Sequence, residues 1–87
     1  MPVPADLLMR WRERARAIRN GPSAEKREPV AEAIEAFADY LEAGRSRWQF
    51  TFPIGDVDAG IAIVDALEVC NVELDGAAEA HRRASMS

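Results

Sequence analysis

Two residues of this chain have side chains that often act as nucleophiles, bases or zinc ligands: the single cysteine, Cys70, and the single histidine, His81. His81 stands beside two arginines near the end of a predicted helix, where a cationic side chain stabilises the negative end of the helix dipole. Cys70 falls on an apolar helical stripe, which predicts a small core residue and not a reactive thiolate. A structural zinc site needs four ligands of this kind, so we predict no metal and no cofactor.

The acidic residues offer two further kinds of chemistry. The run DVDAG at residues 56–60 is similar to the start of a calcium-binding loop, but its glycine comes one position early and no glutamate stands at the twelfth position. Pairs of carboxylates are frequent, yet they fall on helix faces predicted to lie in water, without the surroundings that a general acid or base needs. No glycine-rich phosphate loop is present. We therefore predict no catalytic residue, no small-molecule substrate and no enzymatic activity.

The composition is that of one small folded domain covering residues 1–87. Apolar residues make up 48% of the chain and charged residues 30%, which is too apolar for a disordered segment. The longest run without a charge, residues 48–55, is too short to cross a membrane. The N-terminal residues lack the apolar stretch of a secretory signal, and the lone cysteine favours a cytoplasmic setting. A core of this size is marginal alone, so a protein partner or a homo-oligomer such as a dimer is expected.

The net charge of −4 is unevenly distributed along the chain. Residues 1–22 sum to +3, residues 23–44 to −4 and residues 45–55 to +2. Residues 56–79 contain seven acids and no base, and the tail adds +2. This alternation favours antiparallel helices that attract one another and argues against a general affinity for nucleic acid. Anionic lipid would repel the acidic segments, so no membrane partner is predicted.

Periodicity predicts an all-α domain similar to a three-helix bundle. The first helix is expected over about residues 4–20, the second within residues 23–43, and the third from Asp56 or Asp58 to about Arg83. In the second helix, Ser23 is a candidate N-cap and Gly44 a candidate C-cap, and Pro29 either kinks the helix or marks its first turn.

Each predicted helix has an apolar stripe at the spacing of one helical face. The stripes are Leu7, Leu8, Trp11, Ala15 and Ile18 in the first helix, Val30, Ile34, Phe37 and Leu41 in the second, and Ile63, Leu67, Cys70 and Leu74 in the third. The third helix has a further apolar face beside its stripe, formed by Val57, Ile61, Val64 and Val72. This arc is wider than one neighbouring helix needs, so the third helix is predicted to be central or to lie at an interface. Gly76 is expected to end its well-packed part.

Five arginines flank the stripe of the first helix: Arg12, Arg16 and Arg19 on one side, Arg10 and Arg14 on the other. Their stems can lie on apolar surface while their guanidinium groups meet a neighbour. We expect them to pair with the acid-rich third helix. The alternative is nucleic-acid binding, with the arginines on phosphates and Trp11 stacked on a base.

The second helix carries an acidic ridge formed by Glu28, Glu32, Glu35, Asp39 and Glu42. The ridge lies almost opposite the apolar stripe of the same helix. From that position its carboxylates are predicted to face solvent or another molecule and not a helix packed on the stripe. The ridge is therefore a second candidate for binding a basic partner.

The segment RSRWQFTFPI at residues 45–54 is different in kind. Its aromatic residues alternate with polar ones, a period of two that is typical of a half-buried strand. No second strand is predicted, so the segment either pairs outside the chain or lies over the helices as an extended linker. Arginine and aromatic residues are enriched at binding hot spots. We predict that the surface for a protein partner is formed by Arg45, Arg47, Trp48, Phe50 and Phe52.

The first half of the chain resembles a known helical hairpin. The motif WRERA at residues 11–15 is followed by ADYLE at residues 38–42, in the manner of the W-R-E-R-A and A-x-x-L-E motifs of small phage and actinobacterial proteins of the excisionase-like type. That family would supply a winged helix-turn-helix, which is missing here, so DNA binding does not carry over. The resemblance implies a phage or mobile-element setting, where small acidic helical proteins such as anti-CRISPR proteins block larger host machines.

These observations favour non-catalytic protein binding, as a regulator or inhibitor of a larger assembly. Two alternatives stay open. One is a structural or accessory subunit of a homo-oligomer or larger complex. The other is a nucleic-acid-binding accessory protein that uses the basic first helix.

Overall fold

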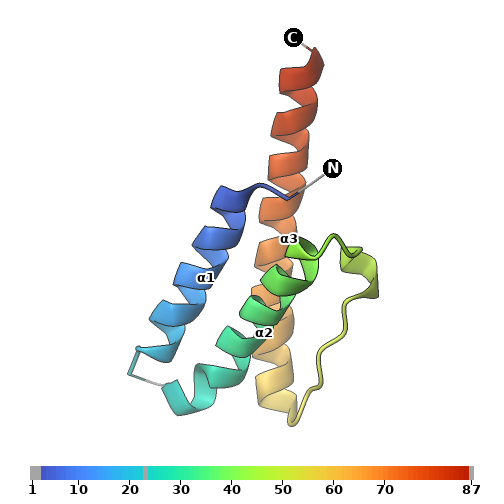
Figure 1. The fold of residues 1–87 in the computed structure, drawn as a ribbon. Coiled ribbons are helices and arrows are strands. Elements are labelled where there is room, and N and C mark those ends of the chain that lie inside the picture. The colour runs from blue at the N-terminus through green and yellow to red at the C-terminus, as the bar shows by residue number, and fades with distance from the viewer. Residues whose placement is uncertain (1–2, 23, 87) are drawn as a thin grey trace.

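The computed structural model describes residues 3–22 and 24–86, with the backbone alone for residues 24–26 (Figure 1). Its elements are α1 (Ala5–Arg19), α2 (Ala24–Glu42), the 3₁₀ helix η1 (Arg47–Gln49) and α3 (Val57–Met86). None of the described residues lies in a strand. The predicted all-α fold with three main helices is confirmed, and the helix bounds agree closely with those expected.

The helix ends form where the sequence places capping residues. Asp56 caps α3, because its Oδ1 accepts a hydrogen bond of 2.8 Å from a backbone amide in the first turn. Gly44 follows α2 with a φ of 84°, the left-handed conformation that glycine adopts without strain. Pro29 lies inside α2, and because the helix begins at Ala24 this proline does not mark its first turn. Ser23, the candidate N-cap of α2, lies outside the described residues.

The helix that holds the bundle together is α2. It packs against α1 along much of its length and against α3 on its other side, whereas α1 and α3 meet at few places. Of the two alternatives predicted for the third helix, the central position is therefore wrong, and a position at an interface stays a prediction. The reason is that the buried part of the α2 surface is wider than the stripe of its large apolar residues. Three alanines with no exposed surface extend its buried arc to two neighbours: Ala31, Ala33 and Ala38.

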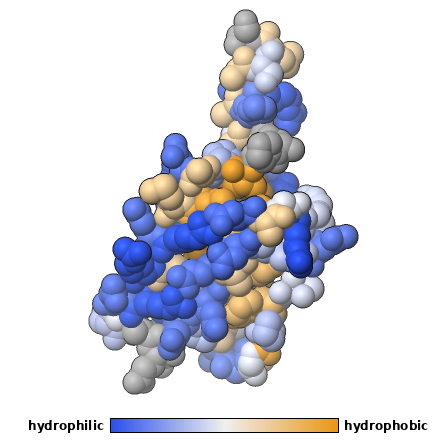
Figure 2. Space-filling model, viewed as in Figure 1, coloured by the Kyte–Doolittle hydropathy of each residue, from blue (hydrophilic) through white to orange (hydrophobic). Residues whose placement is uncertain are grey.

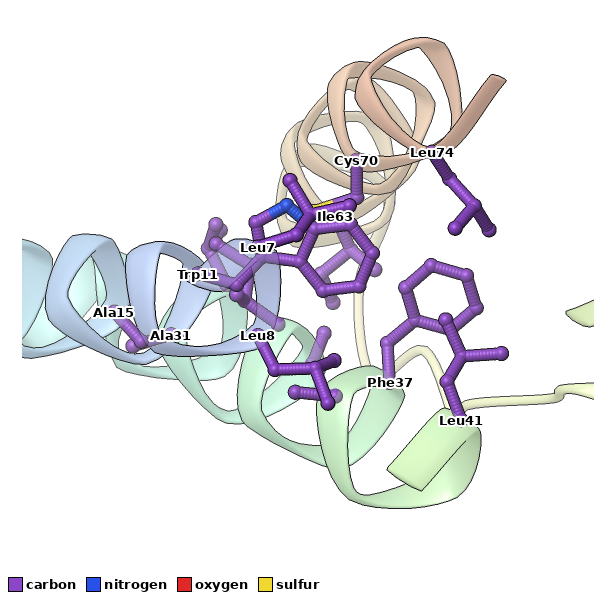
Figure 3. Close-up of a cluster of buried hydrophobic side chains, with 14 residues drawn as sticks. Leu7, Leu8, Trp11, Ala15, Ala31, Phe37, Leu41, Ile63, Cys70 and Leu74 are labelled. Carbon is purple, nitrogen blue, oxygen red and sulfur yellow. The ribbon is translucent and has the colours of Figure 1, made fainter. Parts of the chain in front are cut away.

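The core is built around two stacked aromatic rings (Figure 3). Trp11 of α1 and Phe37 of α2 have ring centroids 5.5 Å apart and planes inclined by 11°. Phe50 lies against this pair from the linker, with its ring centroid 5.0 Å from that of Phe37. The apolar stripes predicted from the sequence supply most of the other buried residues, which include Leu7, Leu8, Ala15, Val30, Ile34, Leu41, Ile63, Cys70 and Leu74.

Residues 45–56 form an extended linker that lies over α2 and α3. Phe50 packs on Phe37 and edge-on to Tyr40, with 5.3 Å between the centroids of the last two rings. Nearer to α3, an added Cβ at Gly60 would come within 2.6 Å of Cγ2 of Ile54, so the glycine permits the linker to approach the helix closely. Within the described residues this segment is a linker that includes η1 and contains no strand, and pairing with a partner stays a prediction.

The C-terminal part of α3 extends beyond the rest of the molecule (Figure 1). Leu74 is buried and Ala77 partly packed, but every residue from 79 to 86 is exposed. Gly76 lies close to where the packing ends, as expected, yet the helix continues through it.

Replacing Gly76 by alanine is expected to stabilise the protein by about 1 kcal/mol, because alanine favours the helix by that amount and nothing lies within 4 Å of an added Cβ. Gly44→Ala is the matched control. It also meets no neighbour within 4 Å, but its left-handed backbone disfavours a side chain and predicts a loss of about 1 kcal/mol. Urea unfolding followed by circular dichroism measures both changes. Equal effects of the same sign would contradict the backbone conformations described here.

Candidate protein-binding site

The structure divides the predicted contact residues between core and surface. Phe50 and Phe52 are partly buried and pack against the core, whereas Trp48 is 79% exposed. A regular period of two would have placed all three rings on one face. The 3₁₀ turn η1 interrupts this period at Trp48 and leaves its indole outside while the two phenylalanines face inward.

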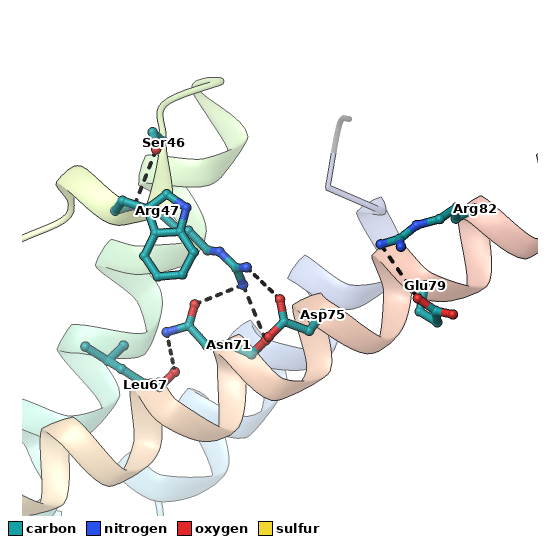
Figure 4. Close-up of polar contacts among 8 residues, drawn as sticks. Ser46, Arg47, Leu67, Asn71, Asp75, Glu79 and Arg82 are labelled. Carbon is teal, nitrogen blue, oxygen red and sulfur yellow. Dashed lines mark hydrogen bonds and ion pairs between the residues drawn. The ribbon is translucent and has the colours of Figure 1, made fainter.

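Arg47 fastens this corner of the linker to α3 (Figure 4). Its Nη2 donates a hydrogen bond of 2.6 Å to Oδ1 of Asp75, and its Nη1 donates one of 3.3 Å to Oδ1 of Asn71. The side-chain amide of Asn71 donates in turn to the carbonyl of Leu67 at 3.1 Å. The Arg47 side chain is 20% exposed and that of Asp75 is 64% exposed, so the guanidinium lies against α3 while solvent still screens the ion pair.

Trp48 is held against the guanidinium of Arg47. The Cζ atom of Arg47 lies 4.4 Å from the centroid of the Trp48 ring, within the range of a cation–π interaction. Oγ of Ser46 accepts a hydrogen bond of 3.4 Å from the backbone amide of Trp48. Arg45 makes a longer contact of the same kind over Tyr40, at 5.5 Å. An indole that is both exposed and positioned loses little conformational freedom on binding.

Two arginines of α1 reach α3. Arg14 makes a bidentate pair with Glu73, with hydrogen bonds of 2.8 and 2.9 Å. Arg10 lies 3.7 Å from the same carboxylate. The hydrogen bonds donated by Arg14 lower the pKa of the Glu73 carboxyl from its ordinary value. For this flank of α1, the predicted pairing with the third helix is confirmed.

The other flank of α1 pairs with α2 and not with α3. Arg12 donates hydrogen bonds of 2.9 Å to Asp39 and 3.0 Å to Glu42, and Arg19 forms an ion pair with Glu35. The prediction that all these arginines pair with the third helix is wrong here. The long side chains of Arg12 and Arg19 reach round from the packed side of α1.

The acidic ridge of α2 is correspondingly smaller than predicted. Glu35, Asp39 and Glu42 are occupied by arginines of α1, so the prediction that they face only solvent or another molecule is wrong. The cause lies in the small buried residues Ala31 and Ala38, which let α1 pack beside the ridge. Glu28 and Glu32 are exposed and form no ion pair with any described residue.

The five arginines of α1 do not form a free basic surface. Four of them have acidic partners within the fold, and Arg16 is the one without an ion pair among the described residues. Trp11, predicted to stack on a base in the nucleic-acid alternative, has no exposed surface. On the face seen in Figure 2, hydrophilic side chains gather over α1 and α2.

Cys70 and His81 lie in unrelated places. Cys70 is fully buried in the core, and this burial raises the pKa of its thiol to about 11, as expected of a core residue. His81 is exposed on the projecting part of α3. Within the described ranges, no three His, Cys, Asp or Glu side chains are grouped to hold a metal ion. No helix there is long and apolar enough to cross a membrane.

The outer face of α3 is apolar and uncovered by the described residues. It comprises the predicted second stripe together with Val69, which the sequence reasoning missed: Val57, Ile61, Val64, Val69 and Val72, all between 51% and 75% exposed. A shallow groove of about 400 Å³ lies on this face, lined by Val69, Val72 and the acidic side chains of Asp65, Glu68 and Glu73. Every residue of this face is thus more than half exposed among the described residues.

Comparisons with protein-family models, with curated proteins and with solved structures found no match for this chain. The likeness of its first half to excisionase-like hairpins accordingly stays a prediction.

Glu73→Gln is expected to destabilise the protein by about 1 kcal/mol near pH 7, because it removes the charge that Arg14 binds. The pKa of Glu73 is lowered in the fold, so the contribution of its ionised form is complete above the pKa of the unfolded chain, about 4.3. This contribution is lost as the pH falls below that value towards the folded-state pKa. The difference in free energy of unfolding between wild type and variant should therefore shrink from pH 5 to pH 3. Glu32→Gln, at an exposed carboxylate, serves as the control. A difference for Glu73→Gln that stays constant down to pH 3 would contradict the pairing.

Proposed function

We propose that this protein is a non-catalytic, protein-binding regulator or inhibitor of a larger assembly, with Trp48 as the anchor of the contact. The observation that carries the proposal is the state of this side chain: its indole is 79% exposed and is nevertheless held by Arg47 at 4.4 Å. Tryptophan and arginine are the residue types that contribute most to binding hot spots. A large aromatic side chain left in water costs hydrophobic free energy that a partner would recover.

Arg47 has a positioning role in this proposal. Its hydrogen bonds to Asn71 and Asp75 tie the linker to α3, so the turn that carries Trp48 is held against this helix. Arg45, which is exposed beside it, supplies a further hydrogen-bond donor for the rim of the contact. Phe50 and Phe52 support the linker from below and are not part of the contact itself.

In this proposal a phage or mobile element encodes the protein. The protein acts in the cytoplasm, where an inhibitor of the anti-CRISPR kind would meet its target. The second candidate, a structural or accessory subunit of a homo-oligomer or larger complex, is favoured by the uncovered outer face of α3. Nucleic-acid binding through α1 receives less support, because the arginines it requires have partners within the fold.

Trp48→Ala is expected to impair binding but not stability, whereas Phe50→Ala is expected to impair stability. Trp48→Ala removes an exposed ring and should change the free energy of unfolding by less than about 0.5 kcal/mol while abolishing partner capture. Phe50→Ala removes a half-buried ring that contacts Phe37 and Tyr40, and should cost about 2 kcal/mol. Thermal unfolding measures stability, and affinity capture from the native host with quantitative mass spectrometry measures binding.

Arg16→Ala, at an exposed position on α1, is the matched surface control for capture. The proposal fails if Trp48→Ala retains the same proteins in the same amounts as wild type and Arg16→Ala. It fails equally if Trp48→Ala is as destabilised as Phe50→Ala, since the indole would then belong to the core.

A further inference from the structure

We infer that the outer face of α3 is a docking surface for a basic amphipathic helix of another protein. The inference rests on the proposed protein-binding function but concerns a different surface from Trp48, and it names the chemistry of the partner. Its physical basis is a set of exposed apolar residues along one side of α3, a groove lined by two of the valines, and carboxylates that lie among and beside these residues.

Apolar residues lie along one side of α3, with the exposed carboxylate of Glu68 between Val64 and Val72. Ile61, Val64 and Val72 are 59%, 54% and 65% exposed, and their spacing puts them on one side of α3, about four turns in length with Val57 at its start. The buried stripe, with Ile63 and its neighbours, faces α2 from the opposite side. An apolar strip of this length on a helix already packed on its other side matches the apolar stripe of one further helix.

The groove gives this strip a defined centre. Val69, Val72 and the carboxylates of Asp65, Glu68 and Glu73 line the groove. Glu73 is bound by Arg14, whereas Asp65 and Glu68 are exposed and have no ion pair with any described residue. A leucine or methionine of a partner helix would cover the two valines, and lysines or arginines one turn away would meet the two carboxylates.

The negative charge of α3 favours a different protein over a second copy of the chain as the occupant of this face. Residues 56–79 contain seven acids and no base, so two outer faces packed on one another would bring Asp65 and Glu68 of each copy together. In an antiparallel pair, Arg82 and Arg83 of one copy could meet these acids of the other. That register would place the apolar residues of each outer face opposite residues 76–86, which contain no matching row of large apolar residues. Like charges at such short range oppose association.

The chain also lacks a free helix of the required kind among its described residues. α1 is its one basic helix, and four of its five arginines are paired with Glu73 of α3 or with acids of α2. Its apolar stripe is buried in the core. A basic amphipathic helix must therefore come from a different protein.

The probe that tests this inference is a synthetic amphipathic helix of 18 residues, with leucines at the core positions of one face and lysines beside them. A second peptide has glutamate in place of every lysine. We expect the basic peptide to bind the wild-type protein with a Kd of about 10 μM, measured by calorimetry, and the acidic peptide not to bind. Raising the salt concentration should weaken the binding, because the carboxylates of Asp65 and Glu68 are exposed.

The variant Val69→Ser with Val72→Ser should weaken binding of the basic peptide at least about tenfold. Both residues are more than half exposed, so the fold should be kept, and circular dichroism checks this. Asp65→Asn with Glu68→Gln should weaken binding and reduce its salt dependence. The matched controls are Met9→Ser, at a residue 58% exposed on α1, and Glu32→Gln on α2. Both should bind as the wild type does.

Three results would overturn the inference. The first is binding of the basic peptide that Val69→Ser with Val72→Ser leaves unchanged. The second is a dimer in sedimentation velocity that this variant dissociates, which would make a second copy the occupant. The third is loss of peptide binding on Trp48→Ala alone, which would move the contact to the linker and leave the proposed function standing without this surface.

Discussion

The stack of Trp11 on Phe37 is the contact on which the arrangement of the whole molecule depends. It joins α1 to α2 at the centre of the core, and the outer side of Phe37 receives Phe50 of the linker at 5.0 Å. Three segments distant in sequence thus meet at one group of rings. Because α2 carries the middle ring, both α1 and the linker are positioned relative to α2, and α3 packs against the side of α2 that remains. Aromatic contacts of this geometry stabilise beyond the area they bury.

This arrangement explains which charges and which apolar residues remain for function. With α1 beside α2, the arginines on its two flanks reach acids on two different helices, so most of the charge of the basic helix is paired within the fold. α3 packs on α2 through the side of Ile63 and Leu74, and its outer valines are more than half exposed. The linker adds one exposed indole, fixed by Arg47 to the same helix. Both candidate surfaces therefore belong to α3 or to residues fastened on it.

The helices and most of the core could be predicted from the sequence, because a 3.6-residue stripe such as Val30, Ile34 and Phe37 is a local pattern that burial enforces. The order of packing could not. Buried alanines such as Ala31 have no strong pattern of their own, yet they decide that α2 has two neighbours. The exposure of Trp48 depends on a turn held by a hydrogen bond between Arg47 and Asp75, 28 residues apart, and no local period contains such a contact. The acidic ridge was predicted to be unpaired for the same reason. The position of its residues around the axis of α2 does not reveal that arginines of α1 are long enough to reach them.

The most direct test of this account is the solvent exposure of methyl groups in the isolated protein. Paramagnetic relaxation by a soluble, uncharged gadolinium complex, recorded in methyl NMR spectra of the chain alone, measures it residue by residue. We expect strong relaxation of the methyls of Ile61, Val64 and Val72 and weak relaxation of those of Ile63 and Leu74 on the opposite side of α3. If Ile61 and Val64 were as protected as Ile63, the outer face of α3 would already be covered in the isolated protein. The claim of an open docking surface would then be contradicted.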